Sequence, residues 1–136
     1  ASRARGEARC TRLGHRPRIY FEEWDEPGIT AVQWVSELIE VAGGSNIFAE
    51  RAASPLARDR ILADPLEVVR RDPEIIIGSW CGKRFRPERV AARPGWSGVS
   101  AVRAGRLHEI KSAIILTPGI VAIREGLPLL EKILDL

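Results

Sequence analysis

The sequence contains no methionine, only two cysteines, and no apolar run close to the ~20 residues that a membrane-spanning helix needs. Cys10 and Cys81 lie far apart and match neither a zinc-ligand nor a CxxC spacing, so no metal finger or disulfide framework is indicated. The opening residues are rich in arginine and lack an apolar core, so we expect no signal peptide in them. Because the chain starts at Ala1 and lacks methionine, we expect it to be a processed or excised piece.

Glycine-rich nucleotide-binding motifs of the GxGxxG and P-loop kinds are also absent, so nucleotide binding has no support in the sequence. The net charge of +3 is unevenly distributed, because residues 1–18 contain six arginines and one glutamate. The other 118 residues contain 15 basic and 17 acidic side chains, so the body of the chain is slightly acidic. A small group at Arg84, Arg86, Arg89 and Arg93 is expected to be a solvated charged face, and no nucleic-acid partner is expected.

Three short segments have the composition of β-strands, and each is followed by a polar loop. They cover residues 18–22, 74–78 and 106–110. The middle segment contains Ile75-Ile76-Ile77, a continuous β-branched run typical of a strand that is buried on both faces. Helical patterns alternate with these strands. The sequence therefore predicts an α/β fold, with helices on both sides of a mainly parallel central sheet in a three-layer α/β/α lobe.

Two helices have clear signals at their ends. Residues 29–42 carry apolar side chains at spacings of three and four and are followed by Gly43-Gly44, a left-handed stop. Asp64 precedes a second, short helix and is a suitable cap for it. Glu67 follows three residues later, as in a capping box, so a reciprocal pair of cap hydrogen bonds is expected there.

Further helices are expected in residues 86–93 and 117–134. Pro128 lies inside the second of these and should kink it, because its ring clashes with the carbonyl four residues earlier. Residues 49–62 are expected to be a loop with weak helical character, and residues 96–102 a loop.

The loops that follow the strands are the expected place for function. Right-handed crossovers place residues 22–28, 79–85 and 111–116 along one edge of the sheet. Ligands bind at that edge in open α/β sheets. Gly78 permits a close or unusual turn where the middle strand stops. The next loop presents a hydroxyl, an indole, a thiol and an ammonium group, on Ser79, Trp80, Cys81 and Lys83.

Four motifs in order along the chain resemble a known family. They are Phe21-Glu22-Glu23-Trp24-Asp25-Glu26-Pro27, then Ala42-Gly43-Gly44 with Asn46-Ile47-Phe48, then Asp72-Pro73-Glu74-Ile75-Ile76-Ile77, and finally Gly105-Arg106-Leu107-His108-Glu109-Ile110. Together they resemble the carboxyl-terminal lobe of the cobalamin and ferric-siderophore class of ABC-transporter periplasmic substrate-binding proteins, of class III fold. The likeness covers about residues 17–134. The loops around Trp24 and at residues 79–83 look most like members assigned to cobalamin.

In that family two α/β lobes are joined by one long helix, and the ligand lies in the cleft between them. The resemblance implies that residues 1–16 are the tail of this helix and that residues 17–136 are the carboxyl-terminal ligand-binding lobe. It also implies two protein partners, the missing amino-terminal lobe and an ABC-transporter permease whose arginines pair with Glu67. A periplasmic or cell-surface lipoprotein location is implied by the resemblance alone.

The function implied by the resemblance is to bind cobalamin or a related corrinoid in the interlobe cleft and deliver it to the permease, without a catalytic step or a cofactor. Binding of a ferric siderophore or heme by the same fold is the alternative. The family's cleft loops map onto residues 22–28, 56–62, 79–85 and 111–116. Members often have an aromatic residue in the second and fourth loops, where this chain has Ile61 and either Ser112 or Ala113.

The flat side chains of Trp24 and Trp80 lie in polar loops and suit a broad apolar ligand such as a corrin. Lys83 and Lys111 suit amide, phosphate or carboxylate groups on the ligand. The acidic residues within 22–26 have no histidine nearby and irregular spacing, so we expect no metal site. The complete set expected to contact the ligand is Glu22, Glu23, Trp24, Asp25, Trp80, Cys81, Lys83, Phe85, Lys111 and Ser112.

A function of a different class, a thiol-dependent enzyme, would require Cys81 to act as the nucleophile. A nucleophilic thiol needs a base, and His108, oriented by Glu109, is the candidate on a neighbouring strand. However, His108 lies in the middle of its predicted strand and no oxyanion motif is evident. We therefore expect Cys81 to be inert and the protein not to be an enzyme.

Overall fold

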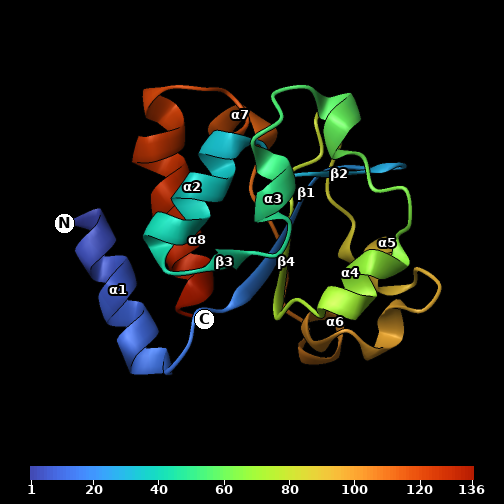
Figure 1. Ribbon diagram of the computed structural model, residues 1–136, viewed down its shortest axis with the longest axis horizontal. Helices are drawn as coiled ribbons and strands as arrows, with labels where there is room; N and C mark the ends of the chain where they lie inside the picture. Colours follow the sequence, from blue (N-terminus) through green and yellow to red (C-terminus); the bar gives the residue numbers. More distant parts are fainter.

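Parallel pairing of three short strands forms the centre of the computed structural model, which describes all residues from 1 to 136 (Figure 1). The central strand β4 (Ile75–Gly78) lies between β1 (Arg18–Asp25) and β5 (Leu107–Glu109) and is parallel to both. β3 (Ser45–Asn46) pairs in parallel with the start of β1, and β2 (Gly28–Thr30) pairs antiparallel with its end. The predicted, mainly parallel sheet is confirmed.

The two faces of the sheet are covered by different helices, as Figure 1 shows. One face packs against α2 (Gln33–Ala42) and α8 (Leu127–Leu134). The other packs against α4 (Leu66–Arg71), α5 (Pro87–Ala91) and α6 (Ser100–Ala104), together with a 3₁₀ turn at Trp96–Gly98. This arrangement confirms the predicted three-layer fold.

Alternation along the strands supplies both hydrophobic layers. Ile75 and Ile77 point into the layer under α2 and α8, whereas Ile76 points into the layer on the opposite face. All three side chains are fully buried. A continuous apolar run is therefore needed here, because successive side chains of a strand alternate between two faces that are both covered.

The helix predicted over residues 29–42 begins later than expected, at Gln33. Ile29 and Thr30 instead belong to β2 and pair with the end of β1, with Thr30 opposite Glu22. This pairing satisfies backbone groups that a helix would have used, so the tertiary ladder takes precedence over the helical spacing of the apolar residues. The predicted stop at Gly43 is confirmed, with the residue at φ 106°.

The prediction of a loop at residues 96–102 was wrong, because most of these residues form the 3₁₀ turn and α6. The cap of α6 comes from a distant residue. The Asp72 carboxylate accepts hydrogen bonds from the Ser100 backbone N–H at 2.7 Å and from the Ser100 hydroxyl at 2.8 Å. A cap supplied from 28 residues away leaves no local signal in the sequence. The segment at 49–62 contains α3 (Ala49–Ala52) and a 3₁₀ turn at Ala57–Arg60, in line with its weak helical character.

The capping box predicted at the start of α4 forms only in part. The Asp64 carboxylate accepts a hydrogen bond from the Leu66 N–H at 3.0 Å, as a capping residue does. The Glu67 side chain does not accept the return hydrogen bond from the Asp64 backbone N–H that a capping box requires. Its carboxylate instead accepts hydrogen bonds from Arg51 and Arg71, each at 2.8 Å, because two guanidinium groups compete with a single backbone amide.

Pro128 occupies the second position of α8, after a π-helical segment at Ala122–Gly126. The predicted continuous helix from residue 117 is therefore replaced by two segments with different hydrogen-bond patterns. Residues 120–134 are helical without a break, so Pro128 lies inside this helix, and the π-helical segment just before it changes the hydrogen-bond pattern where Pro128 has no N–H to donate. The position of Pro128 thereby has a structural explanation.

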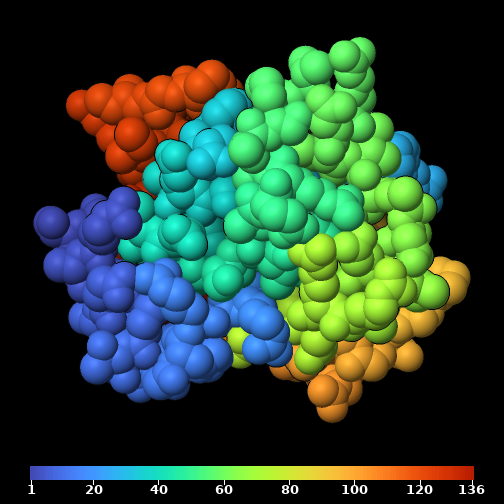
Figure 2. All heavy atoms as spheres, in the orientation of Figure 1, coloured from blue at the N-terminus to red at the C-terminus, as the bar shows by residue number.

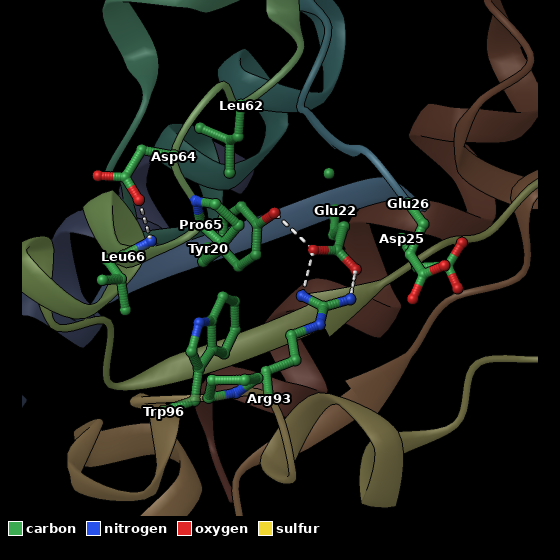
Figure 3. Close-up of a pocket in the computed structure, with 12 residues that line it drawn as sticks. Tyr20, Glu22, Asp25, Glu26, Leu62, Asp64, Pro65, Leu66, Arg93 and Trp96 are labelled. Carbon is green, nitrogen blue, oxygen red and sulfur yellow. Dashed lines mark hydrogen bonds and ion pairs between the residues drawn. The ribbon is translucent and has the colours of Figure 1, made fainter.

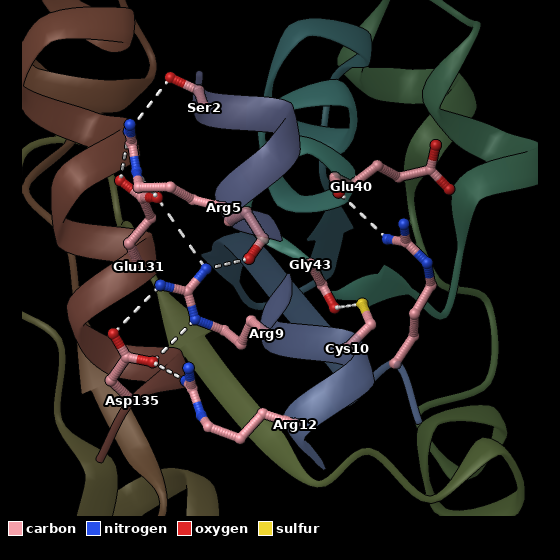
Figure 4. Close-up of polar contacts among 11 residues, drawn as sticks. Ser2, Arg5, Arg9, Cys10, Arg12, Glu40, Gly43, Glu131 and Asp135 are labelled. Atoms are coloured by element: carbon pink, nitrogen blue, oxygen red, sulfur yellow. Dashed lines mark hydrogen bonds and ion pairs between the residues drawn. The ribbon is translucent and has the colours of Figure 1, made fainter. Parts of the chain in front are cut away.

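The arginine-rich start of the chain forms α1 (Ser2–Leu13), which lies against α2 in the space-filling view (Figure 2). Gly6 permits the close approach, because a Cβ there would overlap the backbone carbonyl of Val41. Arg9 is only 6% exposed and donates to Asp135 at 2.8 Å and to the carbonyl of Ala42 at 2.6 Å (Figure 4). Basic side chains therefore attach α1 to the end of α8.

No helix in the structure combines the length and the apolar character needed to cross a membrane.

We predict that Arg9→Ala lowers the free energy of unfolding by about 2–3 kcal/mol, because it leaves the buried Ala42 carbonyl without its charged donor and removes two hydrogen bonds to Asp135. Arg12 is the matched control. It pairs with the same Asp135 at 2.9 Å but is 62% exposed, so Arg12→Ala should cost less than about 1 kcal/mol. Urea denaturation measures both values, and equal losses would contradict this view of α1.

Candidate ligand-binding site

The carboxyl ends of the three parallel strands lie level with one another. Glu22 of β1 pairs with Gly78 of β4, and Gly78 pairs with Glu109 of β5. The loops that follow β4 and β5 therefore begin at the same edge of the sheet, next to the hairpin formed by β1 and β2. This is the edge at which open α/β sheets bind ligands.

A buried carboxylate, that of Glu22, organises this edge. The side chain is 1% exposed and lies in β1, which includes the strand predicted over residues 18–22 and extends to Asp25, so the loop expected from residue 22 begins later. Its oxygens accept hydrogen bonds from the Tyr20 hydroxyl at 2.6 Å and from both terminal nitrogens of Arg93 at 2.8 Å (Figure 3). The Trp80 indole donates a further hydrogen bond at 3.0 Å. Four donors thus compensate for the burial of the charge.

The same group of residues changes the titration of Tyr20. Burial, and then the adjacent Glu22 carboxylate, hold the pKa of the Tyr20 hydroxyl well above its usual value. The hydroxyl therefore remains protonated at neutral pH and continues to donate to Glu22. The pKa of Arg93 is also raised by its bonds to Glu22, although burial acts in the opposite direction.

Within the loop at residues 79–85, the buried side chains of Trp80 and Phe85 form a supporting layer beneath the exposed residues 81–84. Trp80 is 3% exposed and Phe85 is 4% exposed, and their rings meet edge to face with centroids 5.0 Å apart. The Phe85 backbone N–H donates to Glu109 at 3.0 Å. Gly78 lies under the Phe85 ring, where a Cβ would overlap the ring carbons. Gly78 is therefore required for close packing of this loop, which agrees with the turn expected there.

Lys83 joins the two tryptophans that we expected at the rim. Its ammonium nitrogen lies 4.5 Å from the centroid of the Trp24 ring and 5.3 Å from that of Trp80. The same nitrogen is 2.9 Å from the Asp25 carboxylate. The two tryptophans therefore lie on the same side of the molecule, with Trp24 partly exposed and Trp80 buried.

A surface hollow of about 330 Å³ lies beside Lys83. It brings together residues from the loops that follow β4 and β5. Three of them are basic and one, Glu109, is acidic, so the hollow has a surplus of positive charge. The lining residues are Trp80, Gly82, Lys83, Arg84, Glu109, Lys111, Ser112 and Ala113.

The structure therefore divides the predicted contact residues into two groups. Glu22, Glu23, Trp80 and Phe85 make internal contacts that hold the edge together. Glu23 accepts a hydrogen bond from the Val32 N–H at 2.7 Å, and burial raises its pKa although Arg60 opposes that shift. The more accessible group comprises Trp24, Cys81, Lys83, Lys111 and Ser112, while Asp25 is paired with Lys83. For both groups, contact with a ligand stays a prediction.

Two arginines essential to this arrangement were missed in the sequence analysis. Arg93 was assigned to a solvated face, yet it pairs with Glu22. Arg60 is 3% exposed, donates to the Thr30 carbonyl and lies 3.0 Å from the Glu23 carboxylate. Each partner is at least 30 residues away, so the only signal in the sequence was an excess of acidic side chains that required neutralisation.

The side chains considered for a thiol-dependent enzyme do not form a pair. Cys81 is exposed, whereas His108 is only partly exposed. His108 lies in β5 opposite Ile77, and its buried Nε2 has no partner. Burial, assisted by Arg106, lowers the pKa of His108. No group of three His, Cys, Asp or Glu side chains in the chain could hold a metal ion.

Glu67, the expected docking residue, belongs to a separate charged cluster with Glu50, Arg51 and Arg71. Glu67 is 23% exposed and pairs with both arginines. The guanidinium groups also flank the buried ring of Phe48, at 5.1 Å and 4.3 Å from its centroid. Glu67 therefore reaches the surface within an ion-pair network.

Residues 4–114 match the model of the periplasmic binding protein family, and the chain belongs to this family. Proteins of this family bind solutes, and the family is periplasmic. No curated protein matches the sequence.

Solved structures of similar fold bind different ligands. The vitamin B12 binding protein BtuF of Vibrio cholerae is 20% identical with a TM-score of 0.63, over 98% of this chain and 50% of that one. The heme-binding protein BhuT, solved with two hemes, is 19% identical with a TM-score of 0.74 over 98% and 50%. The heme-binding protein RhuT from Roseiflexus sp. RS-1 is 17% identical with a TM-score of 0.67 over 98% and 50%. The chain therefore spans about half the length of these proteins.

We predict that Gly78→Ala destabilises the fold by about 1–3 kcal/mol, because the new methyl group must displace the Phe85 ring. Gly98→Ala is the control, since no atom lies within 4 Å of a Cβ at that position. Thermal unfolding of the two variants compares them directly. A loss at Gly78 no larger than that at Gly98 would show that the loop does not pack as described.

We also predict that Arg93→Met costs about 3–5 kcal/mol, because it leaves the Glu22 carboxylate buried without its cation. Adding Glu22→Gln to this variant removes the unpaired charge and should restore part of the loss. Urea denaturation of both single variants and the double variant gives the coupling between the two sites. Strictly additive losses would contradict the assigned pair.

Proposed function

We propose that the chain is one lobe of a solute-binding protein of an ABC importer, and that it binds cobalamin or a related corrinoid. The family match and the alignment of the strand ends support this proposal. The observation that carries it is the position of Lys83, which connects Trp24 to the edge where the β4 and β5 loops begin. In this role the protein performs no chemistry.

The rim has two kinds of surface suited to such a ligand. Trp24 offers a partly exposed aromatic face beside the Lys83 ammonium. Lys111 is 65% exposed and adds a second ammonium group next to Ser112. A broad ring system with amide or phosphate substituents would contact the indole with its flat part and the lysines with its polar groups.

A ferric siderophore or heme is the second candidate ligand. The positive surplus around the hollow supports it, because carboxylates or other anionic groups on an iron chelate would be attracted there. Two of the similar structures described above are heme-binding proteins. The two candidates differ in the charge of the groups that Lys83 and Lys111 would meet.

The protein partners belong to the same proposal. An amino-terminal lobe would supply the other wall of the cleft, with residues 1–16 as the tail of the connecting helix and residues 17–136 as the carboxyl-terminal lobe. An ABC permease would dock through Glu67, whose carboxylate would exchange its bonds to Arg51 and Arg71 for bonds to permease arginines. The proposed location is periplasmic or on a cell-surface lipoprotein.

Isothermal titration calorimetry of the chain paired with an amino-terminal lobe of the family tests the proposal. Cobalamin should release saturable heat, and the chain alone should bind at least tenfold more weakly because half of the contacts are missing. Lys83→Ala should weaken binding, whereas Lys132→Ala, on the exposed side of α8, should not. Heat with a ferric siderophore or heme but none with cobalamin would select the second candidate. No heat with any of them would overturn the proposal.

A further inference from the structure

A second cavity, of about 390 Å³, lies at the side of the sheet and is separate from the hollow beside Lys83 (Figure 3). No residue lines both of them. The boundary between them is the ion pair of Asp25, which lines the cavity, with Lys83, which lines the hollow. The cavity lies on the face of the sheet covered by α4 and α5, beneath the hairpin of β1 and β2.

The walls of this cavity are mainly aromatic and aliphatic. Tyr20 and Trp96 form one wall, with ring centroids 6.1 Å apart and an interplanar angle of 65°. Leu62 precedes α4 and Leu66 is its first residue, and Gly28 of β2 adds no side chain. Figure 3 shows these side chains around one space. A volume of this size and an apolar lining suit a compact organic molecule.

One buried polar group at this cavity has no partner. Trp96 is 1% exposed, and its indole N–H makes no hydrogen bond. The nitrogen is closed off from water in this conformation. Leu66, which also lines the cavity, lies beside the start of the turn that carries Trp96, since a Cβ on Gly95 would lie 2.8 Å from Leu66 Cδ2. Leu66 is 44% exposed, so its side chain can change rotamer without disturbing the core. A ligand with a hydrogen-bond acceptor would then satisfy a donor that is costly to leave unpaired.

The charges around the cavity exclude one class of ligand. Four carboxylates line it, on Glu22, Asp25, Glu26 and Asp64. Arg93 is the only cation in the lining, and both of its terminal nitrogens are used by Glu22. Glu22, Asp25 and Asp64 are paired with Arg93, Lys83 and Arg70, and Glu26 has no cationic partner. An anionic ligand would therefore find no free cation in the lining and would meet the unpaired Glu26 carboxylate, whereas a neutral acceptor would meet no such repulsion.

We infer that this cavity is a second small-molecule site, which takes a compact, uncharged aromatic ligand whose hydrogen-bond acceptor meets the indole N–H of Trp96. The cavity shares Glu22 and Asp25 with the residues expected to contact the cleft ligand, but it contains neither Lys83 nor Lys111, which would meet that ligand's polar groups. The β1–β2 hairpin and the segment before α4 form its walls, so an occupant would stabilise their relative positions.

The test uses two probes of the same shape and different charge, benzamide and benzoate. Each is titrated into the ¹⁵N-labelled 136-residue chain while the four tryptophan indole N–H signals are followed by NMR. Benzamide should shift the Trp96 signal saturably and bind at least fivefold more tightly than benzoate. The Trp34 signal should stay in place, because that indole donates to the Ile115 carbonyl on the opposite face.

Two matched leucine variants locate the site. Leu66→Trp fills the cavity opening and should abolish the saturable shift of Trp96. Leu13→Trp changes a leucine of similar exposure, 41%, at the end of α1 and should leave binding unchanged. Both positions are on the surface, so both variants should keep a dispersed amide spectrum.

Four results would overturn the inference. The first is the absence of a saturable Trp96 shift with benzamide, and the second is equal or tighter binding of benzoate. The third is a set of shifts confined to residues 82–84 and 111–113, which would place benzamide in the hollow. The fourth is binding to the Leu66→Trp variant as tight as to the unmodified chain.

Discussion

The buried carboxylate of Glu22 is the interaction on which the functional edge of this lobe depends. It connects its own strand β1, through Tyr20, to Trp80 in the loop after β4 and to Arg93 after α5. A carboxylate that is 1% exposed is tolerated only when donors replace its water, and here four hydrogen bonds do so. Removing any of these donors would leave the others around an under-compensated charge.

This arrangement separates support from ligand contact. Glu22 and Trp80 are enclosed and fix the positions of the loops, whereas Trp24 and Lys83 remain accessible at the rim that those loops form. Lys83 belongs to both systems, because it lies over the two indoles and pairs with Asp25. A rigid layer beneath an accessible rim suits a protein that binds by closing a cleft, since the ordering cost at the rim is then already met in the free lobe.

The sequence predicted the parts of the fold that depend on local patterns. The β-branched run at residues 75–77, the glycine stop after α2 and the level strand ends all follow from periodicity, backbone chemistry and crossover handedness. It could not predict features made by distant partners. Arg93 reaches Glu22 across 71 residues, and Asp72 caps α6 across 28. For the same reason, Trp80 was expected to face a ligand because it lies in a polar loop, although its burial depends on a carboxylate 58 positions away.

Hydrogen–deuterium exchange of the Glu22→Gln variant tests the central role of this carboxylate most directly. If Glu22 holds the edge together, peptides covering residues 79–85 and 93–96 should both exchange faster than in the unmodified chain. Peptides from α1 and α2 should be unchanged, because their contacts lie on the other side of the sheet. Unchanged exchange at both loop segments, or an equal increase throughout the chain, would contradict this account.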